Sequence, residues 1–141
     1  VKEHVLRMVH EGRVPHALMF SGCEGAGAMP MALALARHLL CEHPTSEGPC
    51  QTCAGCRMTA GWAHPDLHFV FPVVKGTASS STTVVSDQYL PQWREQLAET
   101  PYFTHQTWVQ RMGAGNQQSQ ISVAEAEGLI ASLAIMSNHG G

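Results

Sequence analysis

The stretch ALMFSGCEGAGAMPMALALARHLL, residues 17–40, decides the fold. Its first four residues, Ala17 to Phe20, form a short apolar run that is typical of a strand buried in a parallel sheet. A glycine-rich loop follows, and the part from Met29 to Leu40 is rich in strong helix formers. Strand, glycine loop and buried helix occur in this order in P-loop folds. The stretch therefore predicts an α/β protein with a parallel sheet.

The glycine loop lacks the two side chains that a working P-loop uses. In the pattern G-x-x-x-x-G-K-[ST], backbone amides cradle phosphates, the lysine reaches the β- and γ-phosphates, and the hydroxyl holds magnesium. The frame consists of three glycines, Gly22, Gly25 and Gly27. Ala28 occupies the lysine position and Met29 the hydroxyl position, while Glu24 adds a charge that repels phosphate. We therefore expect no ATP hydrolysis. A plain tight turn, and anion binding by the amides of residues 25–28, are the alternatives.

Four of the five cysteines lie within residues 41–56, spaced C-x8-C-x2-C-x2-C. They are Cys41, Cys50, Cys53 and Cys56. Two-residue gaps let successive thiolates turn toward one ion, and four sulfurs suit tetrahedral zinc. A closed four-thiolate site leaves no position for water, so its predicted role is structural. Disulfides, free buried thiols and an iron–sulfur cluster are the alternatives.

Several residues near the cysteine cluster receive secondary roles. Gly48, Pro49 and Gly55 are expected to supply the turns that wrap the ion. His64 could replace one ligand, but with four cysteines available it is expected to be a turn or surface residue. Cys23, in the glycine loop, is expected to be a small packed residue.

The remaining pattern is mainly helical. Apolar spacing predicts helices at residues 2–11, 87–99 and 105–112, the last with Thr104 as its N-cap, and a final helix that starts at Ser122. Ser122 and Glu125 form a capping-box pattern. The apolar stripe of the final helix consists of Leu129, Ile130, Leu133 and Met136.

A second strand is predicted at 67–71 and a mobile loop at 77–83. Trp93 and Trp108 are expected to pack inside the protein.

Composition limits the functional classes. The chain has 141 residues, of which 44% are hydrophobic and 13% charged, and its formal net charge is −3. This charge provides no global basic field for nucleic acid. No apolar run is long enough to span a membrane, so we expect a cytoplasmic protein. Two predicted parallel strands need neighbours, so we expect a truncated part of a larger domain.

These motifs together resemble the clamp-loader subunits of bacterial DNA polymerase III, which are AAA+ proteins. The resemblance rests on Val14-Pro15-His16-Ala17, Ser21-Gly22, the helix after the glycine loop, the cysteine spacing, and His64-Pro65-Asp66. It covers residues 1–72 and returns at 121–141, whereas residues 73–120 look like an insertion. It implies a P-loop NTPase-like, three-layer AAA+ fold. Residues 1–141 would form the N-terminal part of the first AAA+ domain, with a zinc module at 41–56.

The resemblance also implies a function. Gamma and tau subunits of this family keep the lysine and hydrolyse ATP, whereas the delta prime branch often has a degraded loop. The loop of this chain resembles the degraded form, because Ala28 and Met29 replace the lysine and the hydroxyl residue. It implies a non-catalytic subunit that acts with gamma or tau and delta to place the sliding clamp on primed DNA. One alternative is an AAA+ subunit that binds nucleotide without hydrolysis. Another is a nucleic-acid-binding zinc ribbon, which is disfavoured because residues 41–56 contain no Lys or Arg.

Overall fold

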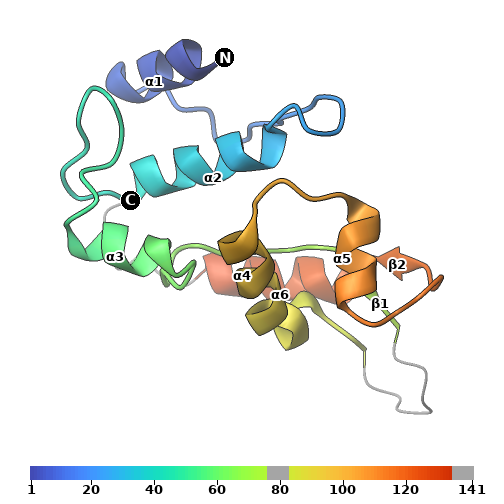
Figure 1. Ribbon diagram of the computed structural model, residues 1–141. Helices are drawn as coiled ribbons and strands as arrows, with labels where there is room; N and C mark the ends of the chain where they lie inside the picture. Colours follow the sequence, from blue (N-terminus) through green and yellow to red (C-terminus); the bar gives the residue numbers. More distant parts are fainter. Residues whose placement is uncertain (76–82, 135–141) are drawn as a thin grey trace. The chain divides into compact units, whose positions relative to one another are not determined.

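The computed structural model describes residues 1–75 and 83–134 (Figure 1). The chain divides into two compact units, Val1–Leu67 and His68–Gly141, which we treat separately. The first unit contains α1 (Lys2–His10), α2 (Ala28–Leu39) and α3 (Ala54–Ala60). The second contains β1 (Val73–Val74), the 3-10 helix η1 (Ser86–Tyr89), α4 (Leu90–Glu99), α5 (His105–Arg111), β2 (Ser119–Gln120) and α6 (Val123–Leu133). None of the helices among these residues is long and apolar enough to cross a membrane.

Helix α2 is central to the first unit, since it contacts both α1 and α3. Leu33 and Leu35 of α2 are buried, as is Val5 of α1. Gly27 precedes α2 with φ +85°, a left-handed conformation that glycine adopts without strain. The helix starts one residue before the predicted Met29, and Pro30 lies in its first turn, where no intrahelical donor is needed. The helices predicted for this unit are confirmed.

The predicted strands at 17–20 and 67–71 are wrong for the structure as described. Residues of both segments lack strand pairing, and Leu18 and Met19 are 42% and 88% exposed. The sheet that is present pairs Val73 with Gln120 and Val74 with Ser119 in antiparallel register. The N–H and C=O groups of a parallel strand must form hydrogen bonds with neighbouring strands. Within residues 1–75 and 83–134, no strand is paired with either of these two segments.

Aromatic side chains form the core of the second unit. Phe71 stacks on Trp93 with ring centroids 4.2 Å apart. The Trp108 ring stands edge-on to both, at centroid distances of 5.1 Å from Phe71 and 4.9 Å from Trp93. The indole N–H of Trp108 donates to the Pro72 carbonyl at 2.8 Å, so its polar atom is satisfied inside the core. The prediction that both tryptophans serve packing is confirmed.

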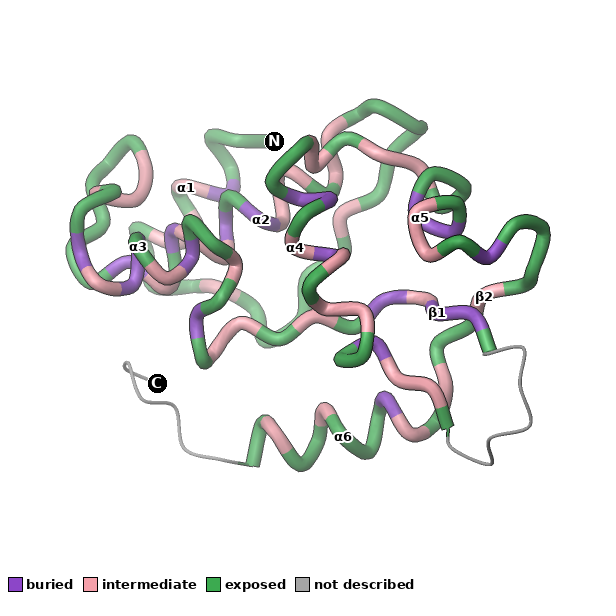
Figure 2. Tube along the Cα trace, turned by 60° about the horizontal axis from the view of Figure 1, so that its bottom comes forward, coloured by how far each residue is buried: buried purple, intermediate pink, exposed green. Residues whose placement is uncertain are grey.

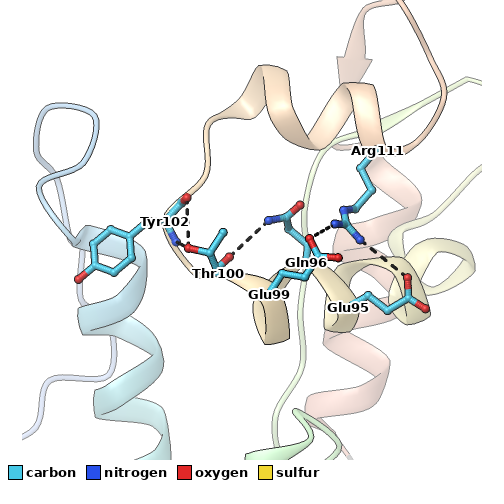
Figure 3. Close-up of polar contacts among 6 residues, drawn as sticks. All are labelled: Glu95, Gln96, Glu99, Thr100, Tyr102 and Arg111. Carbon is cyan, nitrogen blue, oxygen red and sulfur yellow. Dashed lines mark hydrogen bonds and ion pairs between the residues drawn. The ribbon is translucent and has the colours of Figure 1, made fainter.

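Polar contacts join α4 to α5 at the surface of this unit (Figure 3). The Arg111 guanidinium, at the end of α5, forms ion pairs with Glu95 and Glu99 of α4. After α4, the Tyr102 N–H donates to the Thr100 hydroxyl oxygen at 3.1 Å, which shapes the connection. The predicted N-cap of α5 is confirmed, because the Thr104 hydroxyl accepts the Thr107 N–H at 3.1 Å.

Helix α6 starts where predicted, but its capping box does not form. Ser122 is the N-cap residue and its side chain makes no capping hydrogen bond. Glu125 is buried and its carboxylate instead accepts both the backbone N–H and the hydroxyl of Ser86. Most of α6 is exposed (Figure 2), and Val123, Ile130 and Leu133 are 78%, 69% and 65% exposed. Met136 of the predicted stripe and residues 77–82 of the predicted loop lie outside the described residues.

Replacing Trp108 tests the aromatic core. Trp108→Ala removes a side chain that is 1% exposed together with its hydrogen bond to Pro72. We expect the free energy of unfolding to fall by about 3–5 kcal/mol, measured by urea denaturation. Tyr102→Ala is the matched control, because Tyr102 is 59% exposed and its loss should cost no more than about 0.5 kcal/mol. Equal effects of the two substitutions would contradict this description of the core.

Candidate metal centre

The four clustered cysteines converge in the first unit. Their sulfur atoms all lie within 4.8 Å of one another, and the set consists of Cys41, Cys50, Cys53 and Cys56. Cys41 follows the end of α2, Cys53 is the N-cap residue of α3, and Cys56 lies in the first turn of that helix. Cys41, Cys53 and Cys56 are buried, and Cys50 is half-buried. The spacing read from the sequence therefore corresponds to one site that could hold a metal ion.

Backbone amides point at the sulfurs. The Cys50 N–H donates to Cys41 Sγ at 3.2 Å, and the Cys56 N–H donates to Cys53 Sγ at 3.3 Å. A third bond runs from the Gln51 N–H to Cys56 Sγ at 3.2 Å. Such donors stabilise thiolate, which is the form of cysteine that binds metals.

The thiols differ in acidity because their surroundings differ. The backbone N–H of Thr52, aided by the N–H of Cys53 and the Thr52 hydroxyl, lowers the pKa of Cys50 to about 5. The backbone N–H of Cys56 likewise lowers the pKa of Cys53. Burial raises the pKa of Cys56 to about 12, since a charge there would be desolvated among other sulfurs. Without a cation, the cluster therefore contains both ionised thiolate and neutral thiol groups.

Two features of the backbone around the cluster could not be predicted. Gln51 has φ +65°, a left-handed conformation that costs a non-glycine residue about 1–2 kcal/mol, and its N–H thereby reaches Cys56. Gly55 was expected to form a turn, but it lies inside α3. A Cβ atom at Gly55 would be 2.1 Å from the Leu40 carbonyl oxygen, so this position requires close approach of two backbone segments.

The other residues considered as ligands lie outside the cluster. His64 is not among the converging groups and is buried, so the expectation of a surface residue is wrong. Its Nδ1 accepts the Asp66 N–H at 3.1 Å, which agrees with a role in the turn. Cys23 is exposed rather than packed.

The glycine loop keeps its turn but presents no phosphate-binding side chains. Gly25 has φ +78°, and a Cβ on Gly22 would lie 2.9 Å from the Ala26 Cβ, so the loop folds closely on itself. Ala28 and Met29, at the positions of the lysine and the hydroxyl, are the first two residues of α2. Met29 is 38% exposed.

Alkylation rates test the order of acidity in the reduced, metal-free chain. At pH 7 the Cys50 thiol, with a pKa of about 5, is ionised, whereas Cys56, with a pKa of about 12, is protonated. Because thiolate is the nucleophile, iodoacetamide should label Cys50 well before Cys56, as followed by peptide mass spectrometry. Labelling of Cys50 should slow as the pH falls through about 5. In urea the two rates should converge; equal rates in the folded chain would contradict the assignment.

Comparison with known proteins identifies the family. Residues 1–140 match the family model described as DNA polymerase III, delta subunit. DNA polymerase III subunit delta' of Bacillus subtilis (strain 168) is 38% identical over 64 residues, which are 45% of this chain and 19% of that protein. The delta' subunit of Escherichia coli (strain K12) is 33% identical over 70 residues, 50% of this chain and 21% of that protein.

A second group of relatives carries a different subunit name. DNA polymerase III subunit tau of Escherichia coli (strain K12) is 40% identical over 60 residues, 40% of this chain and 9% of that protein. The match spans about a fifth of the length of the first delta' relatives. No solved structure matches the chain significantly. Because one family model matches from residue 1 to residue 140, the chain belongs to the family of DNA polymerase III delta subunits.

Proposed function

We propose that this chain is the N-terminal part of a delta prime subunit of the DNA polymerase III clamp loader and takes no part in ATP hydrolysis. The observation that carries the proposal is the family match over residues 1–140 together with a glycine loop that ends in Ala28 and Met29. Gamma or tau and delta subunits would be its partners, and the complex would place the sliding clamp on primed DNA. In this arrangement neighbouring subunits hydrolyse ATP and this one holds its position in the complex.

The first two residues of α2 argue against ATP chemistry. In a working loop, a lysine at the position of Ala28 would contact phosphate and a hydroxyl at the position of Met29 would hold magnesium. A methyl group and a thioether offer neither a positive charge nor a hard oxygen ligand. Glu24 in the same loop is exposed and adds a negative charge where phosphate would approach.

Nucleotide binding without hydrolysis is a second candidate, favoured by one observation. The N-cap residue of this 12-residue helix is Gly27, which has no side chain to accept a hydrogen bond from the first-turn amides. Such amides attract anions. Residual affinity for the phosphates of a nucleotide would follow from this geometry alone.

The cysteine cluster supports a structural zinc ion. Four sulfurs at tetrahedral corners around zinc, with bonds of about 2.3 Å, are about 3.8 Å apart. The Cys41–Cys53 and Cys50–Cys56 sulfur distances are both 3.9 Å. Cys41, Cys50, Cys53 and Cys56 would be the ligands, and the amides directed at their sulfurs would orient them. Zinc would supply charge compensation and cross-linking here, with no catalytic role.

The domain organisation follows from the same proposal. The chain would be the front part of the first AAA+ domain, with the zinc module at residues 41–56 and an insertion at 73–120. A parallel sheet would form the middle layer of that three-layer domain.

Nucleotide binding is tested with the full-length protein that contains this segment. We expect no heat of binding when ATP and magnesium are added in calorimetry, because Ala28 and Met29 provide no phosphate or metal contact. A micromolar affinity would favour the second candidate instead.

The same protein, mixed with gamma or tau and delta subunits, should co-elute with them and support clamp loading. Failure to join that complex would contradict the proposed function.

Zinc is tested by elemental analysis and two matched substitutions. The reduced chain should contain about one zinc ion, and chelation should lower its thermal stability. Cys53→Ser should abolish stoichiometric zinc and lower the melting temperature, since Cys53 is both a proposed ligand and the cap of α3. Cys23→Ser should change neither quantity, because Cys23 is exposed and outside the cluster. A chain purified under reducing conditions without zinc would refute the metal site.

A further inference from the structure

Residues on both sides of Cys41 meet the same glycine of α3. The Glu42 carboxylate accepts the backbone N–H of Gly55 through Oε1 at 3.2 Å. On the other side of Cys41, the Leu40 carbonyl oxygen would be only 2.1 Å from a Cβ atom at Gly55. Gly55 lies between the proposed ligands Cys53 and Cys56. The segment 40–42 therefore lies close against the start of α3, and the hydrogen bond between Glu42 and Gly55 joins the two.

We propose that Glu42 is a positioning residue of the metal centre: by binding the Gly55 N–H it holds Cys41 in place beside the other three cysteines. This inference rests on the metal site proposed above. Glu42 does not itself belong to the converging set of sulfur ligands, so it would act through Cys41.

The need for such a residue follows from the spacing of the ligands. Cys50, Cys53 and Cys56 are separated by two-residue gaps, so their local backbone brings them together. Cys41 is nine residues before Cys50, and the intervening segment is mostly exposed with a turn in which the Thr45 hydroxyl donates to the Gly48 carbonyl. Holding the two ends of such a loop together has an entropic cost. A contact formed before metal binding removes part of that cost from the binding step.

Glu42 also satisfies one of the N–H groups at the start of α3. The first four N–H groups of a helix have no partner within the helix. Cys53 Sγ accepts the N–H of Cys56, and Glu42 accepts the N–H of Gly55. In the first turn of α3, one N–H group thus binds the sulfur of the proposed ligand Cys53, and another binds the side chain of Glu42, which is next to the proposed ligand Cys41. The contact between Glu42 and Gly55 could not be read from the sequence, because the two residues are 13 positions apart.

Metal titration of three variants of the chain tests this role. Cobalt(II) serves as the probe, since thiolate ligation produces sulfur-to-metal charge-transfer bands, and zinc competition gives the zinc affinity. Glu42→Ala should weaken zinc binding by about 10–100-fold and reduce the charge-transfer intensity as Cys41 becomes loosely held. Glu42→Gln keeps an oxygen acceptor and should restore both values. Glu47→Ala removes an exposed carboxylate from the same loop and should match the wild type.

The outcomes separate this proposal from the metal site itself. Far-UV circular dichroism, which reports α1, α2 and α3 of the first unit together with the helices of the second, verifies that each variant remains folded. A wild-type chain that gives no cobalt bands would overturn the metal site and this role with it. Wild-type binding with an unchanged Glu42→Ala variant would overturn only the role of Glu42. Equal losses in Glu42→Ala and Glu42→Gln would do the same, because charge rather than the hydrogen bond to Gly55 would then be responsible.

Discussion

Four cysteine sulfurs within 4.8 Å of one another impose the constraint on which the first unit depends. They cannot all be ionised at this separation without a counter-charge, because like charges repel strongly where water is excluded. In the metal-free chain, hydrogen bonds from the N–H groups of Thr52 and Cys53 lower the pKa of Cys50, whereas burial raises the pKa of Cys56, so the four sulfurs do not ionise together. A divalent cation would remove this repulsion. The unit has few buried aliphatic side chains, so this centre would carry much of its stability.

Most of the helices could be predicted because their signals are local, although α3 (Ala54–Ala60), within and after the cysteine spacing, was not predicted. Thr104 caps α5 and Gly27 precedes α2, and both positions are specified by residues within one helical turn. Strands depend on partners elsewhere, so the apolar run at 17–20 identified a segment suited to burial without ensuring a sheet. The capping box of α6 failed for a related reason. Glu125 has a partner 39 residues away, Ser86, and its carboxylate binds that residue in place of the local amide.

The ligands of the candidate site could be predicted from the sequence, whereas the backbone and side-chain contacts that position them could not. Cysteine spacing is a strong local signal, and the four sulfurs do converge. Gly55, Glu42 and Gln51 carried no comparable signal, because their roles depend on contacts across the loop and on one left-handed backbone conformation. In the second unit, the segment 73–120 supplies Trp93 and Trp108, which cover Phe71. The described part of that segment therefore contributes two side chains to the core of the second unit.

The burial of Glu125 has a consequence for the dynamics of α6. Glu125 is the one buried side chain of this 11-residue helix, and it lies in the first turn. Isolated helices shorter than about 12–15 residues are marginal in water, so the helix gains little support beyond its anchored end. Amide hydrogens should accordingly exchange with solvent faster toward Leu133 than near Glu125. The helix would therefore be held at its start, near Glu125, and less firmly toward Leu133.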